Sequence, residues 1–330
     1  MRHTRLGRTG LTVSRLCLGT MTFGLQCDDK TSHAILDRAL AGGITFIDTA
    51  DVYPLGGTPD TVGRTEEILG AWLGTRRRDV VLATKCAGAT GPRPWDRGLS
   101  RKHVLDAIDA SLRRLRTDYV DLYQAHHPDP TTPIDETLRA FDDIVRAGKA
   151  RYVGCSNYPA WQTARGLGRS EVLALARWDC VQPRYNLLFR QPERDLLPLC
   201  QEEGLAVIPY NPLAGGFLSG KHRRESGPTE GTRFTLGTAA ARYQERYWRE
   251  REFDTVEALR PLARQAGMSL ARLAVAWVLA HPAITSPIIG ASRPEQLDDV
   301  LPAVDKTLDA ALKAQLDELT SGYRLGDDVR

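Results

Sequence analysis

The most restrictive feature of the chain is a regular alternation of short apolar runs with segments of helical period. In TSHAILDRALAGG, Ile35, Leu36 and Ala39 recur at the spacing of one helix face, and Gly42 begins a glycine pair that is typical of a helix end. The apolar run ITFID follows at once. This pair predicts a helix that leads directly into a buried strand.

The same alternation continues along the 330 residues. Eight apolar runs are strand candidates: SRLCLGT, ITFID, VVLATK, YVDLYQA, ARYVGCS, CVQPRY, LAVIPY and SPIIGA. Later helices are expected at 100–115, 134–147, 160–167, 195–203, 253–266, 270–279 and 295–301. Strands that alternate with helices pair in parallel through right-handed crossovers, so the pattern predicts an α/β protein with a (β/α)8 TIM barrel. No interior stretch resembles a linker, and we expect one domain over residues 1–330.

Two segments depart from the alternation. The opening RLGRTGLTVS carries a turn signal at Thr9-Gly10 and predicts a β-hairpin that caps the bottom of the barrel. Residues 222–252 form the longest interruption and are rich in charge, Gly and Pro. A loop of this length inside a domain is typical of a functional element, so we expect it at the carboxyl-terminal face, where such barrels bind their ligands.

Composition excludes several classes of protein. Hydrophobic residues make up 42% of the chain, and the 44 basic residues nearly balance the 41 acidic ones. This balance argues against nucleic-acid and membrane-surface partners. The six cysteines form no C-x-x-C pair, and neither a signal-peptide core nor a run of about 20 apolar residues is visible. We expect reduced cysteines and a cytoplasmic protein without a metal site.

Polar residues follow several of the strand candidates. They are Asp48, Lys85, His126, Ser156, Asn157, Gln182, Tyr210 and Asn211. Each alone has a structural explanation, such as a cap or a satisfied core histidine. If Asp48 and Lys85 end neighbouring strands, the ammonium group neutralises the buried carboxylate, and Tyr53 can reach the same point. A nearby cation stabilises phenolate, so we expect the Tyr53 pKa to fall below about 10, as suits a general acid.

Several ordered motifs give the chain a family resemblance. They are LCLGTMTFG, FIDTADVY, ATK, DLYQAHHPD, VGCSNY, VQPRYNLL, IPYNPLAGGFLSGK and PIIGASRPEQL. Together they resemble the aldo-keto reductases, in particular the branch with bacterial reductases and potassium-channel β subunits. The resemblance implies a (β/α)8 barrel and a catalytic set of Asp48, Tyr53, Lys85 and His126. His127 is the alternative histidine, but neighbouring residues of a strand point to opposite sides and the family pattern selects His126.

The resemblance also implies an NADP(H) site without the G-x-G-x-x-G fingerprint, which is absent. The positions that would bind the cofactor are Thr20, Met21, Ser156, Asn157, Gln182, Tyr210, Asn211, Leu213, Gly215, Gly216, Lys221, Arg233, Gly290, Ser292, Arg293 and Gln296. Arg293 would favour NADP over NAD, since a guanidinium pairs with a 2′-phosphate. Val300 stands where many relatives have an adenine-contacting Asn, which leaves Asp299 as a weaker substitute.

The implied activity is NADPH-dependent reduction of an aldehyde, ketone or keto-sugar carbonyl to the alcohol. Expected walls of the substrate pocket are Phe23, Val52, Trp95, Pro128, Phe217, Tyr247 and Trp248. Two alternatives stay open. GGFLSGK matches a phosphate loop, but His222 replaces the Ser or Thr that would bind magnesium. An NADPH-binding sensor or partner-binding subunit with little turnover is the stronger alternative. The oligomeric state is open.

Overall fold

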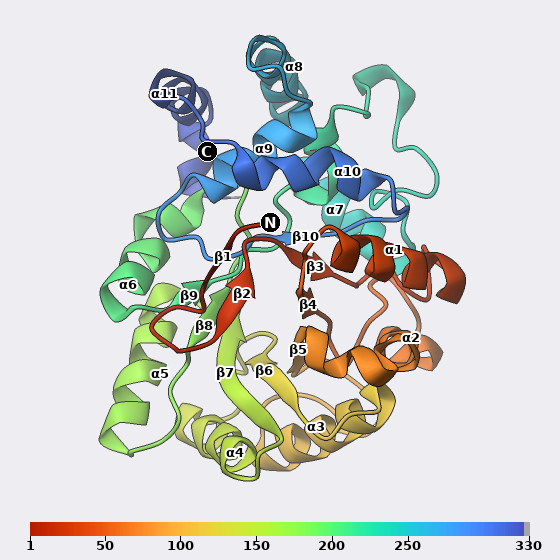
Figure 1. The fold of residues 1–330 in the computed structure, drawn as a ribbon. Helices are drawn as coiled ribbons and strands as arrows, with labels where there is room; N and C mark the ends of the chain where they lie inside the picture. The colour runs from red at the N-terminus through yellow and green to blue at the C-terminus, as the bar shows by residue number, and fades with distance from the viewer. Residues whose placement is uncertain (327–330) are drawn as a thin grey trace.

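Eight parallel strands form one curled sheet in the computed structural model, which describes residues 1–326 (Figure 1). Their spatial order is β10 (Ile288–Ile289), β3 (Cys17–Gly19), β4 (Phe46–Asp48), β5 (Val81–Cys86), β6 (Val120–Ala125), β7 (Ala150–Ser156), β8 (Cys180–Gln182) and β9 (Ala206–Val207). The Thr285 amide donates to the Val207 carbonyl and the Ile288 amide donates to the Pro209 carbonyl, both at a distance of 2.8 Å. These bonds join the two edges of the sheet. The predicted (β/α)8 TIM barrel is confirmed.

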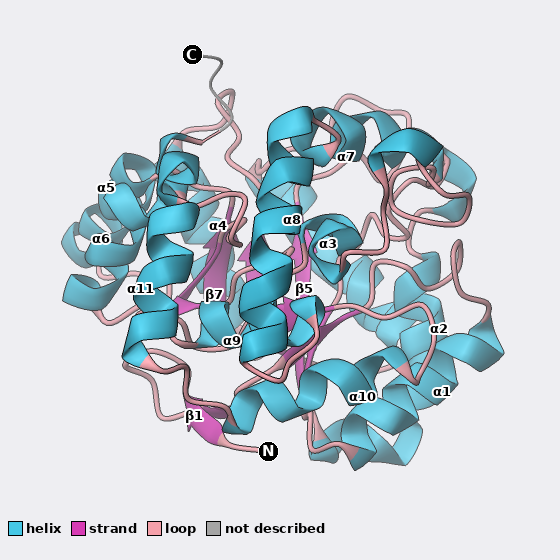
Figure 2. Ribbon diagram, turned by 90° about the horizontal axis from the view of Figure 1, so that it is seen from above, coloured by secondary structure: helices cyan, strands magenta, loops and turns pink. Residues whose placement is uncertain are grey.

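Helices surround the strands on all sides (Figure 2). The helices that connect consecutive strands are α1 (Asp29–Ala41), α2 (Arg64–Leu73), α3 (Arg101–Leu115), α4 (Ile134–Arg146), α5 (Ala160–Val172), α6 (Leu196–Glu203) and, before β10, α7 (Ala240–Tyr247), α8 (Glu250–Gln265) and α9 (Leu270–Leu279). After β10 come α10 (Gln296–Val300) and α11 (Ala310–Leu319). Several begin at a capping side chain, for example that of Asp28, whose carboxylate accepts from the Thr31 amide at 2.7 Å.

Three of these helices were not expected from the sequence. In α2, Ile68, Leu69 and Trp72 are buried at helical spacing, so the apolar period was present but overlooked. In α7 only Tyr243 and Tyr247 are buried, and α11 buries Leu316 alone. Their mostly polar sequences gave little periodic signal.

The N-terminal segment forms the predicted hairpin, β1 (His3–Arg5) with β2 (Thr12–Ser14). The Arg8 amide donates to the Gly204 carbonyl at 2.8 Å, just before β9. The Ser14 hydroxyl accepts from the amides of Thr45 and Phe46 at 3.1 and 3.2 Å, at the start of β4. The hairpin therefore covers the amino-terminal ends of the strands, opposite the face where TIM barrels place their sites.

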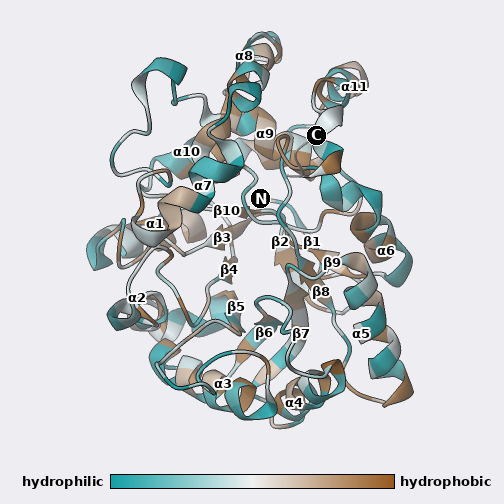
Figure 3. Ribbon diagram, turned by 180° about the vertical axis from the view of Figure 1, so that it is seen from behind, coloured by the Kyte–Doolittle hydropathy of each residue, from teal (hydrophilic) through white to brown (hydrophobic). Residues whose placement is uncertain are grey.

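Two apolar clusters hold the barrel together. The inner cluster fills the barrel with inward strand residues such as Phe46 and Leu122, closed below by Leu6 and Val13 of the hairpin segment. The outer cluster lies between strands and helices, and in Figure 3 hydrophilic and hydrophobic residues alternate along the surrounding helices. All six cysteines are buried and free. Among residues 1–326 no helix is long and apolar enough to cross a membrane.

Candidate active site

A buried ion pair lies at the carboxyl-terminal ends of β4 and β5. The Lys85 ammonium donates to the Asp48 carboxylate at 2.5 Å and to the Thr49 carbonyl at 2.7 Å. Asp48 pairs in register with Ala83, so Lys85, two residues further on, points to the same side of the sheet. The Asp48 and Lys85 side chains are 3% and 0% exposed. Each charge therefore has the partner that its burial requires.

The second oxygen of Asp48 is also satisfied. It accepts from Nε2 of Gln182 at 2.9 Å and from Nε2 of Gln124 at 3.2 Å. Gln124 was not among the candidate residues of the sequence analysis. Its position two residues after inward-facing Leu122 in β6 was the signal that could have found it. The carboxylate is thus held in a fixed orientation by three side chains.

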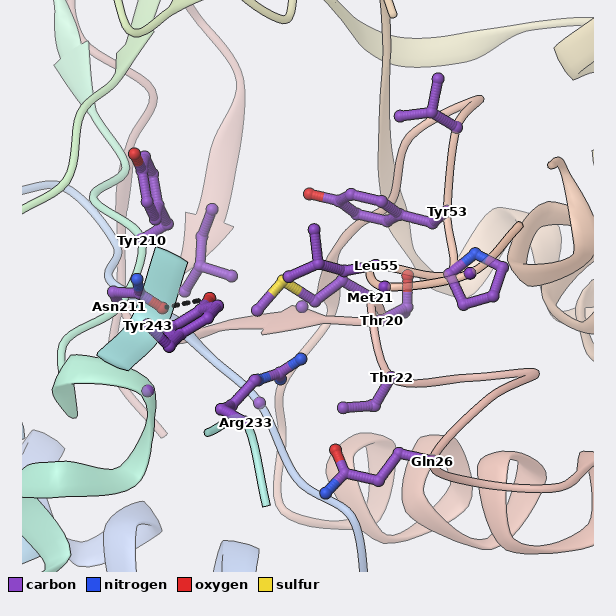
Figure 4. A pocket seen from close by; sticks show the side chains of 18 of the residues that line it. Thr20, Met21, Thr22, Gln26, Tyr53, Leu55, Tyr210, Asn211, Arg233 and Tyr243 are labelled. Carbon is purple, nitrogen blue, oxygen red and sulfur yellow. Dashed lines mark hydrogen bonds between the residues drawn. The ribbon is translucent and has the colours of Figure 1, made fainter. Parts of the chain in front are cut away.

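Tyr53 and His126 lie beside this pair. The Lys85 nitrogen is 5.1 Å from the Tyr53 ring centroid, and the Tyr53 and His126 rings meet edge to face at 5.8 Å. Figure 4 shows the Tyr53 hydroxyl pointing into the cavity toward the side that holds Tyr210. His127 is exposed, with Nδ1 3.0 Å from the Pro128 carbonyl. The structure therefore brings Asp48, Tyr53, Lys85 and His126 together, while His127 lies exposed in the lining of the same cavity.

The pKa of Tyr53 differs from the value below about 10 that the sequence predicts. Burial raises the Tyr53 pKa above 10, and the positive charge of Lys85 only partly opposes this rise. The expected lowering of this pKa is wrong, because removal of water from a buried phenol outweighs one neighbouring cation. Burial alone would lower the Lys85 pKa, but Asp48 raises it overall. Burial and the charge of Lys85 hold the His126 pKa well below 6.5, so its imidazole is neutral.

A cavity of about 1560 Å³ opens above these residues at the mouth of the barrel. Asp48, Tyr53 and His126 line it, while Lys85 lies behind them. Fifteen of the predicted cofactor positions also line it: Thr20, Met21, Ser156, Asn157, Gln182, Tyr210, Asn211, Leu213, Gly215, Gly216, Lys221, Arg233, Gly290, Ser292 and Gln296. Arg293 is exposed and does not line the cavity.

One end of the cavity combines close backbone with positive charge. Gly215 and Gly216 have φ angles of 70° and 100°, a conformation that favours glycine. Burial, together with the charges of Arg293 and Arg233, lowers the Lys221 pKa, so the three cations lie near one another. Nη1 of Arg233 is buried without a hydrogen-bond partner among the described residues. Clustered cations and a free buried donor fit the phosphates of a dinucleotide.

At the end of the cavity near Tyr53, the other polar residues form hydrogen bonds with one another and with the backbone. The Tyr210 hydroxyl donates to Oδ1 of Asn157 at 2.8 Å, and Nδ2 of Asn157 donates to the His126 carbonyl at 2.9 Å. The Ser156 hydroxyl donates to the Gln182 carbonyl at 2.8 Å. These bonds fix the wall of the cavity around Tyr53 and His126.

Several expected pocket walls lie elsewhere. Phe23 is fully buried, and Phe217, Tyr247 and Trp248 pack inside the protein rather than line the cavity. Phe217 and Trp248 belong to an aromatic cluster with His222, Phe234 and Phe253, since apolar rings of the long loop bury one another. Trp95 and Pro128 line a neighbouring cavity of about 700 Å³. Only Val52 is placed as expected, in the main cavity.

Some lining residues were absent from the sequence analysis: Thr22, Gln26, Arg242, Tyr243 and Arg246. Asp299 lines the cavity, but its carboxylate accepts from the Ser269 hydroxyl at 2.7 Å and from the Arg272 guanidinium at 3.3 Å. Its use in an adenine contact would compete with these bonds.

The GGFLSGK segment does not form a phosphate loop. Ala214–Ser219 is a 3₁₀ segment broken at its glycines, and Lys221 is followed by non-helical chain rather than an α-helix. Lys221 therefore does not open a helix, as the lysine of a phosphate loop does in a nucleoside triphosphatase. Among residues 1–326 no group of three His, Cys, Asp or Glu side chains could hold a metal ion.

Sequence comparison matches this barrel and its strand-end residues to one protein family. The model of the aldo/keto reductase family matches residues 15–321. The chain belongs to the aldo/keto reductase family. Within it, the chain is 40% identical to the uncharacterized oxidoreductase YrpG of Bacillus subtilis, over 98% of this chain and 97% of that protein.

Two further relatives of this aldo/keto reductase carry different names. A probable voltage-gated potassium channel subunit beta of Arabidopsis thaliana is 39% identical, over 92% of each chain. A versiconal hemiacetal acetate reductase of Aspergillus parasiticus is 32% identical, over 93% of this chain and 94% of that protein. Family membership and the oxidoreductase relatives show that the chain is an oxidoreductase.

Proposed function

We propose that this aldo/keto reductase uses NADPH to reduce the carbonyl group of an aldehyde, ketone or keto-sugar to the alcohol. The observation that supports this best is the buried Lys85–Asp48 pair beside Tyr53 at the floor of a large cavity. Tyr53 is the general acid, and Asp48, Lys85 and His126 support it.

The raised pKa of Tyr53 suits the direction of carbonyl reduction. At neutral pH the phenol carries its proton, which it can donate to the carbonyl oxygen as negative charge develops there. Neutral His126 donates one ring N–H to the same oxygen and orients the carbonyl. Lys85, fixed by Asp48, stabilises the phenolate that remains. A bound nicotinamide dinucleotide supplies the hydride that reaches the carbonyl carbon.

The cofactor residues follow from the two ends of the cavity. Lys221, Arg233 and the Gly215–Gly216 backbone would hold the phosphates, where the cations cluster. Nδ2 of Asn211 is buried without a partner among residues 1–326 and is a donor available to the cofactor. Tyr210 would stack on the nicotinamide ring. Arg293, at the outer edge near Lys221, would reach a 2′-phosphate and favour NADP(H).

A partner-binding subunit with little turnover is the second candidate function. It is favoured by the similarity to a probable potassium channel subunit beta. Fold alone does not separate the two, because relatives with one barrel differ in function. Tight NADPH binding without turnover of any small carbonyl would favour this candidate.

Tyr53→Phe tests the proposal directly. Phe keeps the ring and its packing but removes the proton, so kcat for carbonyl reduction should fall by about 10²- to 10⁴-fold with NADPH binding unchanged. Lys85→Met should be as severely impaired, and the two losses should not add, because both residues serve one proton transfer. It should also unfold more easily, since Asp48 would be left as an unpaired buried charge.

Tyr119→Phe is the matched control, because Tyr119 packs against Arg77 and Arg151 far from the cavity. Its kcat should equal that of the unmodified protein. A Tyr53→Phe protein that is folded and keeps more than about a tenth of kcat would remove Tyr53 from the role of acid.

A further inference from the structure

Helix α7 brings two arginines to the cavity wall. Arg242 and Arg246 are four residues apart, so they lie on the same side of the helix, and both line the cavity. Tyr243, between them, contacts the cavity wall through its hydroxyl, 3.4 Å from Oδ1 of Asn211. The helix comes from the long loop between β9 and β10. The loop therefore adds positive charge to the mouth of the barrel.

Several arginines that the fold removes from water have carboxylate partners, whereas Arg246, like Arg15 and Arg233, has none among the described residues. Arg77 forms an ion pair with Asp121, and Arg190 forms one with Glu193, both at a distance of 2.8 Å. Arg246 is half-buried, yet within residues 1–326 no carboxylate lies within ion-pair distance of it. A partly desolvated guanidinium without a counter-charge is costly unless a ligand provides one.

Arg246 lies at the catalytic end of the cavity. Burial raises the Tyr210 pKa to about 12, and the charge of Arg246 is the first influence that opposes this rise. Tyr210 bonds Asn157, which in turn bonds the His126 carbonyl. The guanidinium is therefore close to the wall that carries the catalytic histidine.

The cations assigned to the cofactor lie at the other end. The Lys221 ammonium lies close to the backbone of Gly216, since a β-carbon at that position would be 3.7 Å from it. The Arg233 guanidinium lies close to Gly290, where a β-carbon would be 3.9 Å away. Figure 4 places Arg233 beside Thr22 and Gln26, away from Tyr53 and Tyr210. Tyr243 of α7 packs against Gly215 of this end, and Arg246 follows it by about one turn of the helix, on the side that faces Tyr210.

Few negative charges line the cavity as a whole. Asp48 is neutralised by Lys85, and Asp299 is engaged by Arg272. Asp60 is exposed at the rim. Arg97, on the opposite rim after β5, adds a further cation to the lining. An anion in this part of the cavity would meet several positive groups.

We propose that the carbonyl substrate carries an anionic group, a carboxylate or a phosphate, and that Arg246 binds this group. This inference rests on the proposed reduction and deepens it by naming the substrate class. The guanidinium pairs with two oxygens of the anion while the carbonyl lies at Tyr53 and His126. Arg242, one turn earlier on α7, adds long-range attraction from the exposed rim.

The test compares matched substrates with and without the charge. One set is succinic semialdehyde and 4-carboxybenzaldehyde, each against its methyl ester; the other is 4-formylphenyl phosphate against 4-methoxybenzaldehyde. The unmodified protein should show higher kcat/KM for the anionic member, and added KCl should reduce the difference. The set with the larger ratio identifies the anion as carboxylate or phosphate.

Arg246→Gln should lower kcat/KM for the anionic substrates by about tenfold or more, mainly through KM. Rates for the neutral members should stay within about twofold. Calorimetry provides a readout without turnover: 4-carboxybenzyl alcohol should bind the NADP-loaded protein more weakly after the change. Arg249→Gln is the matched control, because Arg249 is exposed, lies three residues further on and does not line the cavity.

Three results would overturn the inference: equal use of charged and neutral substrates, equal effects of Arg246→Gln on both, or a matching loss of NADPH affinity. The last would assign Arg246 to the cofactor. A protein that reduces no carbonyl at all, or a fully active Tyr53→Phe variant, would instead refute the proposed reduction. The two failures are therefore distinguishable.

Discussion

Replacing Asp51 by Asn should change the pH dependence of stability in a direction that the structure fixes. Asp51 is fully buried in the loop between β4 and Tyr53, and neither carboxylate oxygen has a partner among the described residues. Glu66 of α2 is buried nearby and already takes the Arg114 guanidinium at 2.7 Å and the Thr84 hydroxyl at 2.5 Å. Burial, and then the charge of Glu66, raise the Asp51 pKa well above 3.8.

The sign follows from proton binding. The unfolded chain releases the Asp51 proton near pH 3.9, while the folded protein keeps it to a higher pH. Between these two pKa values the folded state binds more protons, so the free energy of unfolding falls as pH rises. The loss is about 1.4 kcal/mol for each pH unit in this window. Asn is neutral at every pH and removes this loss.

The assay is equilibrium urea unfolding of the unmodified protein and Asp51→Asn from pH 4.5 to 8. The free-energy difference between them should grow in favour of Asn by up to about 1.4 kcal/mol per pH unit and then level off. The amide brings two donors into a dry site, which adds a constant offset of about 1–3 kcal/mol. The prediction is therefore tested by how the difference in unfolding free energy changes with pH, and not by its value at any one pH.

Asp60→Asn is the control, because Asp60 is exposed and its substitution should give no such slope. Other carboxylates cancel in the difference between the two proteins. A flat difference, or one that moves against Asn as pH rises, would mean that Asp51 is ionised in the folded protein and shares Arg114 with Glu66. The assignment of a neutral buried acid behind the catalytic loop would then be wrong.

Two further predictions concern the long loop and the cofactor. Burial lowers the His222 pKa to about 4, so the free energy of unfolding should fall as pH drops from about 6.5 toward 4, by at most about 3.4 kcal/mol. His222→Phe should remove this loss of stability in urea unfolding, and a loss that persists in the variant would contradict the prediction. Arg293→Gln should weaken NADPH binding by about tenfold and leave NADH binding unchanged in fluorescence titrations, since a charge-assisted bond to the 2′-phosphate is lost; equal effects on both would remove Arg293 from that role.

Much of the fold was predictable because local pattern and packing agree. The alternation of apolar runs and helical segments gave all eight barrel strands, and helix ends such as Ser100 and Ser269 carry the capping residues observed. Apart from α2, whose apolar period is present, the helices that were not predicted have a weak pattern. Helix α7 carries Arg242, Tyr243 and Arg246 into the cavity, but its sequence is too polar to mark it as a helix.

The candidate site shows the same division. Strand ends converge in a barrel, so the positions of Asp48, Lys85 and His126 in the sequence were enough to predict that they meet. The aromatic residues Phe217 and Trp248 could equally have lined a pocket or packed together, and they pack together. Composition cannot distinguish these outcomes, because both bury the same apolar surface.

The sequence alone determined the barrel, its order of strands and the polar groups at the strand ends. The periods of strands and helices are set locally, and a strand–helix–strand unit pairs its strands in parallel through a right-handed crossover. Only the tertiary structure decided the charge states. Whether Tyr53 gains more from the Lys85 ammonium than it loses through burial depends on how much water the folded chain excludes. The same is true of Asp51, whose neighbours Glu66 and Arg114 come from helices α2 and α3. Solvent exclusion and the distances between charges are properties of the packed chain, so no pattern of residues states them in advance.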